Sequence, residues 1–239
     1  MAAQSNESFQ QERDLQSRAL TVHRRLVGLY GEHPDRPLLD PVGELVSTIL
    51  SQNTNDRNRD RAYDQLRERF PAWEEVRDAP VDAVAAAIRP AGLAQTKAPR
   101  IQAALRRISA ERGAITMDFM AGLPLEEARA WLTAMDGIGP KTAAIVLLFA
   151  FGRPAFPVDT HIHRVTRRLG LIPDNASREK AHLLLEALLP PETYYACHLN
   201  LIRHGRETCH PRRPACVRCV LLDHCPHGRD LSRGPGKEE

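Results

Sequence analysis

The sequence predicts an all-α protein, and three observations support this prediction. Apolar residues recur at spacings of three and four along several segments, which is the period of a helix with one buried face. No run of alternating polar and apolar residues is long enough to indicate a strand. Prolines and glycines interrupt the periodic segments at the places where helices would begin and end.

The first helical stripe covers residues 14–30, and residues 42–52 form an apolar helix that ends in a polar turn. The segment 141–152 is apolar on nearly all sides, which is typical of a helix buried in a core. Residues 1–13 and 229–239 are polar, and we expect them to be disordered tails. The remaining expected helices are 57–70, 97–113, 124–135 and one that begins at Thr160.

Composition limits the possible class of protein. The chain has 239 residues, 42% of them hydrophobic, which is enough to bury a core in one large or two small domains. The stretch from Arg203 to Arg218 holds five arginines and a single acid, which fits either a phosphate-facing surface or a solvated basic face. There is no apolar segment of membrane-spanning length and no secretory signal, so we expect a cytoplasmic protein without membrane contact.

Four of the five cysteines lie in residues 209–225, with the spacing C-x6-C-x2-C-x5-C. Four thiolates so close together predict a metal centre, whereas a cytosolic location disfavours disulfides. Zinc and iron–sulfur clusters both accept four cysteine ligands, so the metal stays open at this point. The fifth cysteine, Cys197, lies on an apolar helical stretch and is expected to be a buried thiol. The four clustered cysteines are Cys209, Cys216, Cys219 and Cys225.

The turn "DGIGPK" at residues 136–141 precedes the buried helix. Its glycines permit a sharp turn, and the free amides of the following helix start can bind an anion such as a DNA phosphate. Lys141 lies at this helix start, where the helix dipole and partial burial would lower its pKa and favour the nucleophilic, neutral amine. The alternatives are a plain connecting turn and a phosphate-binding lysine.

Asp159 follows Lys141 by 18 residues and precedes the helix that begins at Thr160. Its side chain is well placed to cap that helix. A carboxylate near an amine nucleophile can also stabilise positive charge on a sugar or transfer a proton.

With "DGIGPKTAAIVL", "VDTHIHRV", "HGRETC" and the cysteine run in this order, the chain resembles endonuclease III. That family of DNA glycosylases has a helix–hairpin–helix, a Gly/Pro-rich segment, a catalytic aspartate and a [4Fe–4S] cluster. The segments "ILSQNTND" and "AGLAQTKA" resemble its two DNA-facing loops. The resemblance covers residues 14–228. It implies a six-helix barrel domain at 37–152, an iron–sulfur cluster domain from 14–36 and 153–228, and a DNA-binding groove between them.

The resemblance implies base excision repair of oxidised pyrimidines in damaged double-stranded DNA, by a monomer associated with the nucleoid. Lys141 would attack C1′ and form a Schiff base, and Asp159 would assist base departure and the later β-elimination that cleaves the strand. Leu93 would wedge into the base stack, and Asn53 would fill the gap left by the flipped base. The implied [4Fe–4S] cluster would be bound by the four clustered cysteines. The implied DNA-binding residues are Gln52, Asn53, Leu93, Lys97, Gly137, Ile138, Gly139, Arg212 and Arg213.

The sequence departs from the family pattern at three of these places. Asp136 stands where proline is usual, Pro140 where arginine is common, and Asn53 where glutamine is common. We therefore expect weaker DNA binding or an altered lesion choice, because phosphate contacts dominate affinity. Two other functions stay open: a monofunctional adenine- or mismatch-type glycosylase, and a catalytically weak DNA-binding iron–sulfur protein.

Overall fold

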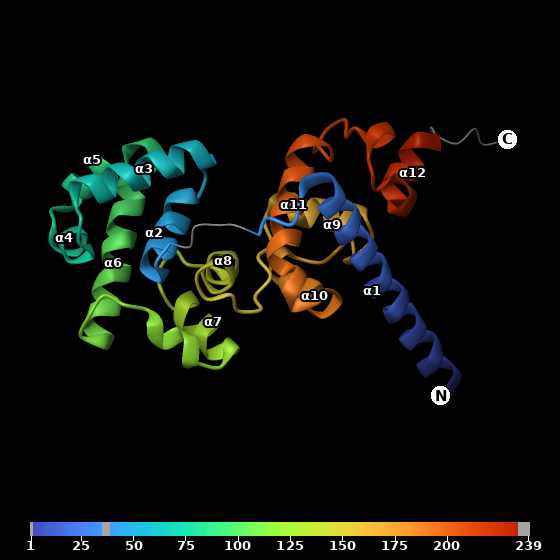
Figure 1. Cartoon of the computed structure of the whole chain (residues 1–239), viewed down its shortest axis with the longest axis horizontal. Helices are drawn as coiled ribbons and strands as arrows, with labels where there is room; N and C mark the ends of the chain where they lie inside the picture. Colours follow the sequence, from blue (N-terminus) through green and yellow to red (C-terminus); the bar gives the residue numbers. More distant parts are fainter. Residues whose placement is uncertain (1, 35–38, 234–239) are drawn as a thin grey trace. The chain divides into compact units, whose positions relative to one another are not determined.

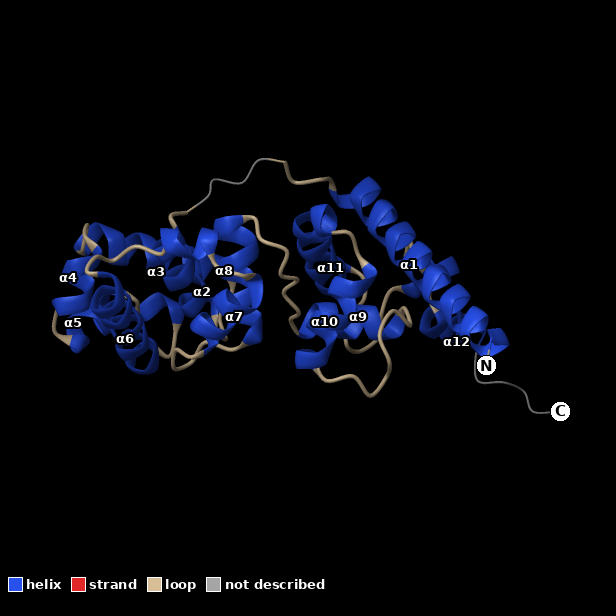
Figure 2. Ribbon diagram, turned by 90° about the horizontal axis from the view of Figure 1, so that it is seen from below, coloured by secondary structure: helices blue, strands red, loops and turns tan. Residues whose placement is uncertain are grey.

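The computed structural model describes residues 2–34 and 39–233, which form helices joined by loops (Figure 1). Neither range contains a strand, and Figure 2 shows helix and loop alone. The all-α prediction is therefore confirmed. None of the helices in these ranges combines the length and the apolar character that crossing a membrane requires.

The chain divides into two compact units that are not consecutive in sequence. Unit 1 comprises Met1–Arg36 and Pro154–Glu239, and unit 2 comprises Pro37–Arg153. The chain therefore starts in unit 1, builds the whole of unit 2, and returns to complete unit 1.

Unit 2 is a bundle of helices around a core that α2 and α8 share. The long helix α6 packs against α4 and α5, while α3 and α8 pack against α2, and α7 packs against α8. The helices of this unit are α2 (Pro41–Ser51), α3 (Asp56–Arg69), α4 (Trp73–Asp78), α5 (Val81–Ala87), α6 (Ala94–Arg112), α7 (Leu125–Thr133) and α8 (Pro140–Phe151), with short 3-10 turns η1 (Arg89–Ala91) and η2 (Asp118–Gly122).

Local sequence signals account for the ends of α2 and α8. The Asp40 side chain accepts a hydrogen bond from the backbone N–H of Gly43 at 2.9 Å, and Pro41 is preset for the first turn of α2. Gly152 ends α8 in the left-handed region at φ 62°, which suits a residue without a Cβ. Both helices are apolar along most of their length, so burying them stabilises the core of unit 2.

In unit 1, α9 packs against α11, and α1 packs against α10 and α11. The segment that holds the four clustered cysteines, residues 209–225, is called the cysteine-rich segment. It follows α11 and leads into the last helix, α12, which packs against α9. The helices of this unit are α1 (Ala2–Tyr30), α9 (Thr160–Arg168), α10 (Arg178–Leu188), α11 (Tyr194–Glu207) and α12 (Pro226–Arg233), with 3-10 turns η3 (Pro191–Thr193), η4 (Cys216–Arg218) and η5 (Leu222–His224).

The expected disordered tails are wrong in part. Helix α1 begins at Ala2, so residues 2–13 are helical, because alanine, glutamine and glutamate continue the helix that the apolar stripe anchors from residue 14. Helix α12 likewise includes residues 229–233, since Pro226 starts a helix there. Residues 234–239 lie outside the described residues.

Candidate active site

The turn before α8 is a tight hairpin. Gly137 has φ 75°, and a Cβ on it would come within 2.7 to 3.0 Å of the Arg100 side chain, so only glycine fits. The Ile138 side chain is buried and anchors the turn. Within the described residues, the backbone N–H groups of Gly139 and Lys141 have no acceptor. They are therefore available to bind an anion at the start of α8.

Lys141 is the second residue of α8, and its side chain is exposed. The partial burial expected from the sequence is wrong, because the first turn of α8 projects from the core that buries the rest of the helix. Asp136 and Pro140 are exposed beside it. The amine is thus freely accessible to a substrate.

The side chain of Gln52 connects the end of α2 to the hairpin. Its Nε2 donates a hydrogen bond to the carbonyl oxygen of Gly137 at 3.0 Å. This bond fixes the hairpin relative to the loop that carries Asn53. Within unit 2, therefore, Gln52 helps to position two segments that the sequence predicts to face DNA.

Lys97 does not face DNA, which corrects the sequence prediction. Its side chain is only 1% exposed, and its Nζ donates to the carbonyl oxygens of Leu50 and Ala91, each at 2.8 Å. Burial lowers the pKa of Lys97. The sequence could not show this burial, because it results from the packing of α6 against α2 and η1 rather than from any local pattern.

Three residues with an expected role in DNA binding have left-handed backbone. Asn53, Leu93 and Arg213 have φ values of 53°, 49° and 50°, a region that non-glycine residues rarely adopt. The Leu93 side chain is 57% exposed although it is large and apolar. Such strain and exposure are frequent at functional sites, so these positions suit insertion into a ligand.

Asp159 caps α9, as the sequence predicted. Its Oδ1 accepts a hydrogen bond from the backbone N–H of Ile162 at 2.7 Å, and its side chain is half-buried. Because the capping bond uses Oδ1, the other carboxylate oxygen stays available to a substrate.

The four clustered cysteines line a single pocket in unit 1. The pocket lies between atoms of α9, the end of α11, the cysteine-rich segment and the start of α12. No acid lines it, and most of its other lining residues are apolar. As they stand, no three Cys, His, Asp or Glu side chains of the described residues are grouped closely enough to hold one metal ion.

The sulfur atoms of this pocket receive hydrogen bonds that suit thiolates. Backbone N–H groups of Leu221 and Gly228 donate to Cys219 Sγ at 3.4 Å and to Cys225 Sγ at 3.3 Å. Burial raises the pKa of Cys219 and of Cys225, so a positively charged centre would be needed to hold both as thiolates. The shared pocket and the N–H donors fit a cysteine-ligated metal centre.

Arg168 and Arg164, one turn apart on α9, hold the start of the cysteine-rich segment. Arg168 donates to Cys209 Sγ at 3.3 Å and to the carbonyl oxygens of His210 and Pro211 at 2.7 and 3.0 Å. Arg164 donates to the carbonyl oxygen of Cys209 at 3.1 Å. Neither arginine belongs to the predicted site residues, although their spacing of four on one helix is a signal that could have found them.

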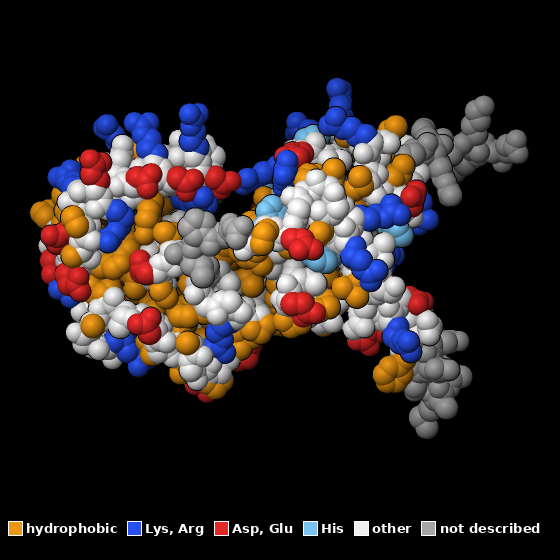
Figure 3. Space-filling model, viewed as in Figure 1, with side chains coloured by type: hydrophobic (Ala, Val, Ile, Leu, Met, Phe, Trp, Pro, Cys, Tyr) orange, Lys and Arg blue, Asp and Glu red, His pale blue; other side chains and the backbone are white. Residues whose placement is uncertain are grey.

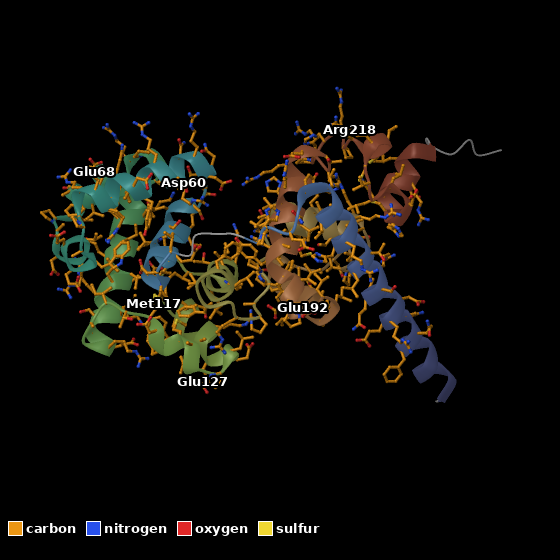
Figure 4. The ribbon with its side chains drawn as sticks, viewed as in Figure 1. Asp60, Glu68, Met117, Glu127, Glu192 and Arg218 are labelled. Atoms are coloured by element: carbon orange, nitrogen blue, oxygen red, sulfur yellow. The ribbon has the colours of Figure 1, made fainter. Side chains whose placement is uncertain are left out.

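The single acid of the basic stretch, Glu207, pairs with Arg203 at 2.9 Å, so the charges of the other four arginines are not offset within the stretch. Arg212 and Arg213 are exposed, as is Arg218, which points away from the ribbon in Figure 4. The space-filling view shows further Lys and Arg side chains over α3, but acids alternate with them there (Figure 3). The arginines of the cysteine-rich segment therefore form the more strongly basic surface.

His204 and Cys197 are buried groups of α11. Burial lowers the pKa of His204 to about 4, so its imidazole is neutral at neutral pH. The Nε2 atom of this ring lies 3.6 Å from Cys219 Sγ. Burial raises the pKa of the Cys197 thiol to about 12, which confirms the predicted buried thiol.

Comparisons with known proteins identify the family. Residues 46–191 match the description "HhH-GPD superfamily base excision DNA repair protein". Endonuclease III of Thermotoga maritima is 34% identical over 195 residues, which cover 82% of this chain and 87% of that protein. An Arabidopsis thaliana protein named as a DNA glycosylase is 38% identical over 162 residues, and this chain spans 55% of its length.

Solved structures agree with the sequence matches. A non-covalent endonuclease III–DNA complex superposes with a TM-score of 0.76 at 27% identity, covering 91% of this chain and 98% of that one. A trapped endonuclease III–DNA covalent intermediate superposes with a TM-score of 0.73, also at 27% identity, covering 90% and 99%. The chain therefore belongs to the HhH-GPD superfamily of base excision DNA repair proteins, as an endonuclease III-like DNA glycosylase.

Proposed function

We propose that the protein is a bifunctional DNA glycosylase and AP lyase that removes oxidised pyrimidines from duplex DNA. The observation that carries this proposal is Lys141, an exposed amine in the first turn of α8 beside the free amides of Gly139 and Lys141 itself. A monofunctional glycosylase uses water as its nucleophile and needs no amine at this place. The trapped covalent intermediate of a similar fold supports the same chemistry.

In the proposed reaction, Nζ of Lys141 attacks C1′ while the bond from C1′ to the damaged base breaks. The base leaves with the bonding electron pair and takes up a proton, and the sugar ring opens to give a Schiff base between C1′ and Nζ. Removal of a C2′ proton then expels the 3′ phosphate by β-elimination, which cleaves the strand. Asp159 would stabilise the positive charge on the sugar and transfer protons through its free carboxylate oxygen.

The DNA-facing residues would bring a damaged nucleotide to Lys141. A base and its C1′ cannot be reached inside a duplex, so the nucleotide must be extruded. Leu93 would wedge into the stack, and Asn53 would fill the gap. The hairpin amides would bind a phosphate, as would Arg212 and Arg213 on unit 1. We also propose that the protein acts as a monomer associated with the nucleoid.

We further propose that the four clustered cysteines hold a [4Fe–4S] cluster, that unit 1 is the iron–sulfur domain, and that unit 2 is the six-helix barrel domain. When bound, the cluster would supply four strong bonds to thiolates, which would fix the cysteine-rich segment. The shared pocket and the N–H donors to sulfur support this fit. The cysteine-rich segment itself would present Arg212 and Arg213, and its hydrogen bonds would join it to α9.

A cleavage assay tests the enzymatic proposal. The protein is incubated with a labelled duplex that contains thymine glycol, and base release and strand cleavage are measured without alkali. We expect both products from the wild type and loss of strand cleavage in Lys141→Ala. Base release with strand cleavage only after alkali would instead show a monofunctional glycosylase. Binding without either product would show a protein that binds DNA but does not act on it. Either of these two alternative results would contradict the proposal.

A further inference from the structure

The buried ammonium of Lys97 joins the starts of two loops. Leu50 lies in the last turn of α2, and Ala91 ends η1. The carbonyl oxygens of both residues therefore have no backbone N–H donor within their own helix. Lys97 Nζ donates to both carbonyl oxygens at 2.8 Å. Burying a charge is costly unless such partners satisfy it, so an apolar residue would serve packing alone at lower cost.

Each of these carbonyls lies just before a residue with left-handed backbone. Asn53 follows Leu50 by three residues, and Leu93 follows Ala91 by two. The backbone conformations at Asn53 and Leu93 persist only where the surroundings hold the chain on either side. Lys97 provides such a hold for both loops at once, from a single point in α6.

We propose that Lys97 is a positioning residue for base extrusion, whose ammonium sets the spacing between the loop that carries Asn53 and the loop that carries Leu93. It would act through these loops and would not touch DNA, since it is buried. This inference rests on the proposed function of the two loops. It differs from a general role in stability, because its loss should change excision by more than an equal loss of stability elsewhere on α6 does.

Gln102 offers a matched control on the same helix. Its side chain is also 1% exposed, and its Nε2 donates to two carbonyl oxygens, those of Val76 and Ala79, at 2.9 and 2.7 Å. Those acceptors lie at the end of α4 rather than beside the DNA-facing loops. Lys97→Met and Gln102→Met therefore remove comparable buried hydrogen bonds at different places.

The test measures extrusion separately from chemistry. In the full-length Lys141→Ala protein, which lacks the amine that would form the Schiff base, a 2-aminopurine next to thymine glycol reports unstacking by its fluorescence at saturating protein. Excision rates at saturation are measured with Lys141 intact, on a paired lesion and on the same lesion in an unpaired bulge. Melting temperatures are measured for every variant.

We expect Lys97→Met to lower both the unstacked population and the excision rate on the paired lesion by about tenfold or more. The free energy that a hydrogen bond to a charged group contributes corresponds to a factor of that size. The defect should shrink to within about threefold on the bulged lesion, whose extrusion costs less. Gln102→Met should lower the melting temperature similarly but change excision by less than about twofold. If Lys97→Met fails to fold, Lys97→Gln, which keeps an amide donor, takes its place.

Equal excision defects in the Lys97 and Gln102 variants would overturn the inference, as would a Lys97 defect of the same size on the bulged lesion. Failure of the proposed function is a separate result. In that case the wild type would release no base, while the fluorescence assay would still report whether Lys97 controls unstacking.

Discussion

Leu93 combines two unfavourable features at one residue, a left-handed backbone and an exposed apolar side chain. For a residue with a Cβ, this conformation costs about 1–2 kcal/mol. Leu93→Gly should relieve that cost and raise the free energy of unfolding by up to about 1 kcal/mol, whereas Leu93→Ala should not. Both variants lack the wedge, so both should excise thymine glycol from duplex DNA about tenfold more slowly. Chemical denaturation and excision kinetics measure the two effects; unchanged excision in both variants would show that Leu93 is no wedge.

Asp159 has a structural role and a proposed chemical role, and one substitution separates them. Asn caps helices as well as Asp does, so Asp159→Asn should change the free energy of unfolding by less than about 0.5 kcal/mol. The amide carries no negative charge, so we expect the excision rate at saturating DNA to fall by about 100-fold or more. Full activity in Asp159→Asn would assign the residue to capping alone.

At this scale the sequence predicts side chains in local contexts better than side chains buried by tertiary contacts. The Asp159 cap and the buried Cys197 follow from neighbouring residues, and both are confirmed. Lys97 lies in a segment that resembles a DNA-facing loop, yet packing against α2 and η1 buries it. Its two acceptors lie 47 and 6 residues away along the chain, a pairing that no local pattern reveals.

The hairpin before α8 has lost an arginine at Pro140 relative to the family pattern, but α6 places Arg100 directly over Gly137. Arg100 has no acidic partner within the described residues, so its charge is available to a phosphate. Arg100→Ala should reduce the slope of log affinity against log salt by about 0.9, the value for one phosphate contact on duplex DNA. Arg106→Ala, which changes an exposed arginine further along α6, should leave the slope unchanged.

Pro140→Arg tests the position at which this chain has proline and the family commonly has arginine. At low salt it should tighten DNA binding, and in the Arg100→Ala background it should restore the lost slope, because either cation can neutralise the same phosphate. Binding isotherms over a salt series provide the measurement. If Pro140→Arg leaves affinity unchanged in both backgrounds, the hairpin does not hold a phosphate.

Helix α9 carries Asp159 at its start and Arg168 at its end, so it links the proposed catalytic carboxylate to the cysteine-rich segment. If the cysteines hold an iron–sulfur cluster, the purified protein should be brown, and Arg168→Ala should lose the visible absorbance faster during exposure to a chelator. The substitution removes three hydrogen bonds to that segment. A colourless protein with bound zinc would replace the cluster by a zinc site.

At the scale of the molecule, the chain builds unit 1 from both of its ends and unit 2 from its middle. Helical periodicity predicts most helices to within a few residues, since each buries one apolar face. It underestimates α1, because residues 2–13 have no apolar stripe and continue the helix by propensity alone. The pairing of α1 with α10 and α11 joins the first helix to helices that begin at Arg178 and Tyr194, which a single sequence does not encode as a local signal.

The proposed reaction requires Lys141 to form a covalent bond with the sugar of a damaged nucleotide. The chain has only four lysines, at positions 97, 141, 180 and 237, so the attachment site can be assigned without ambiguity. The most direct measurement traps the protein on thymine glycol duplex with borohydride and maps the modified peptide by mass spectrometry. We expect one DNA adduct per protein, on Lys141, and none in Lys141→Ala. An adduct on another lysine, or base release with no adduct at all, would contradict it.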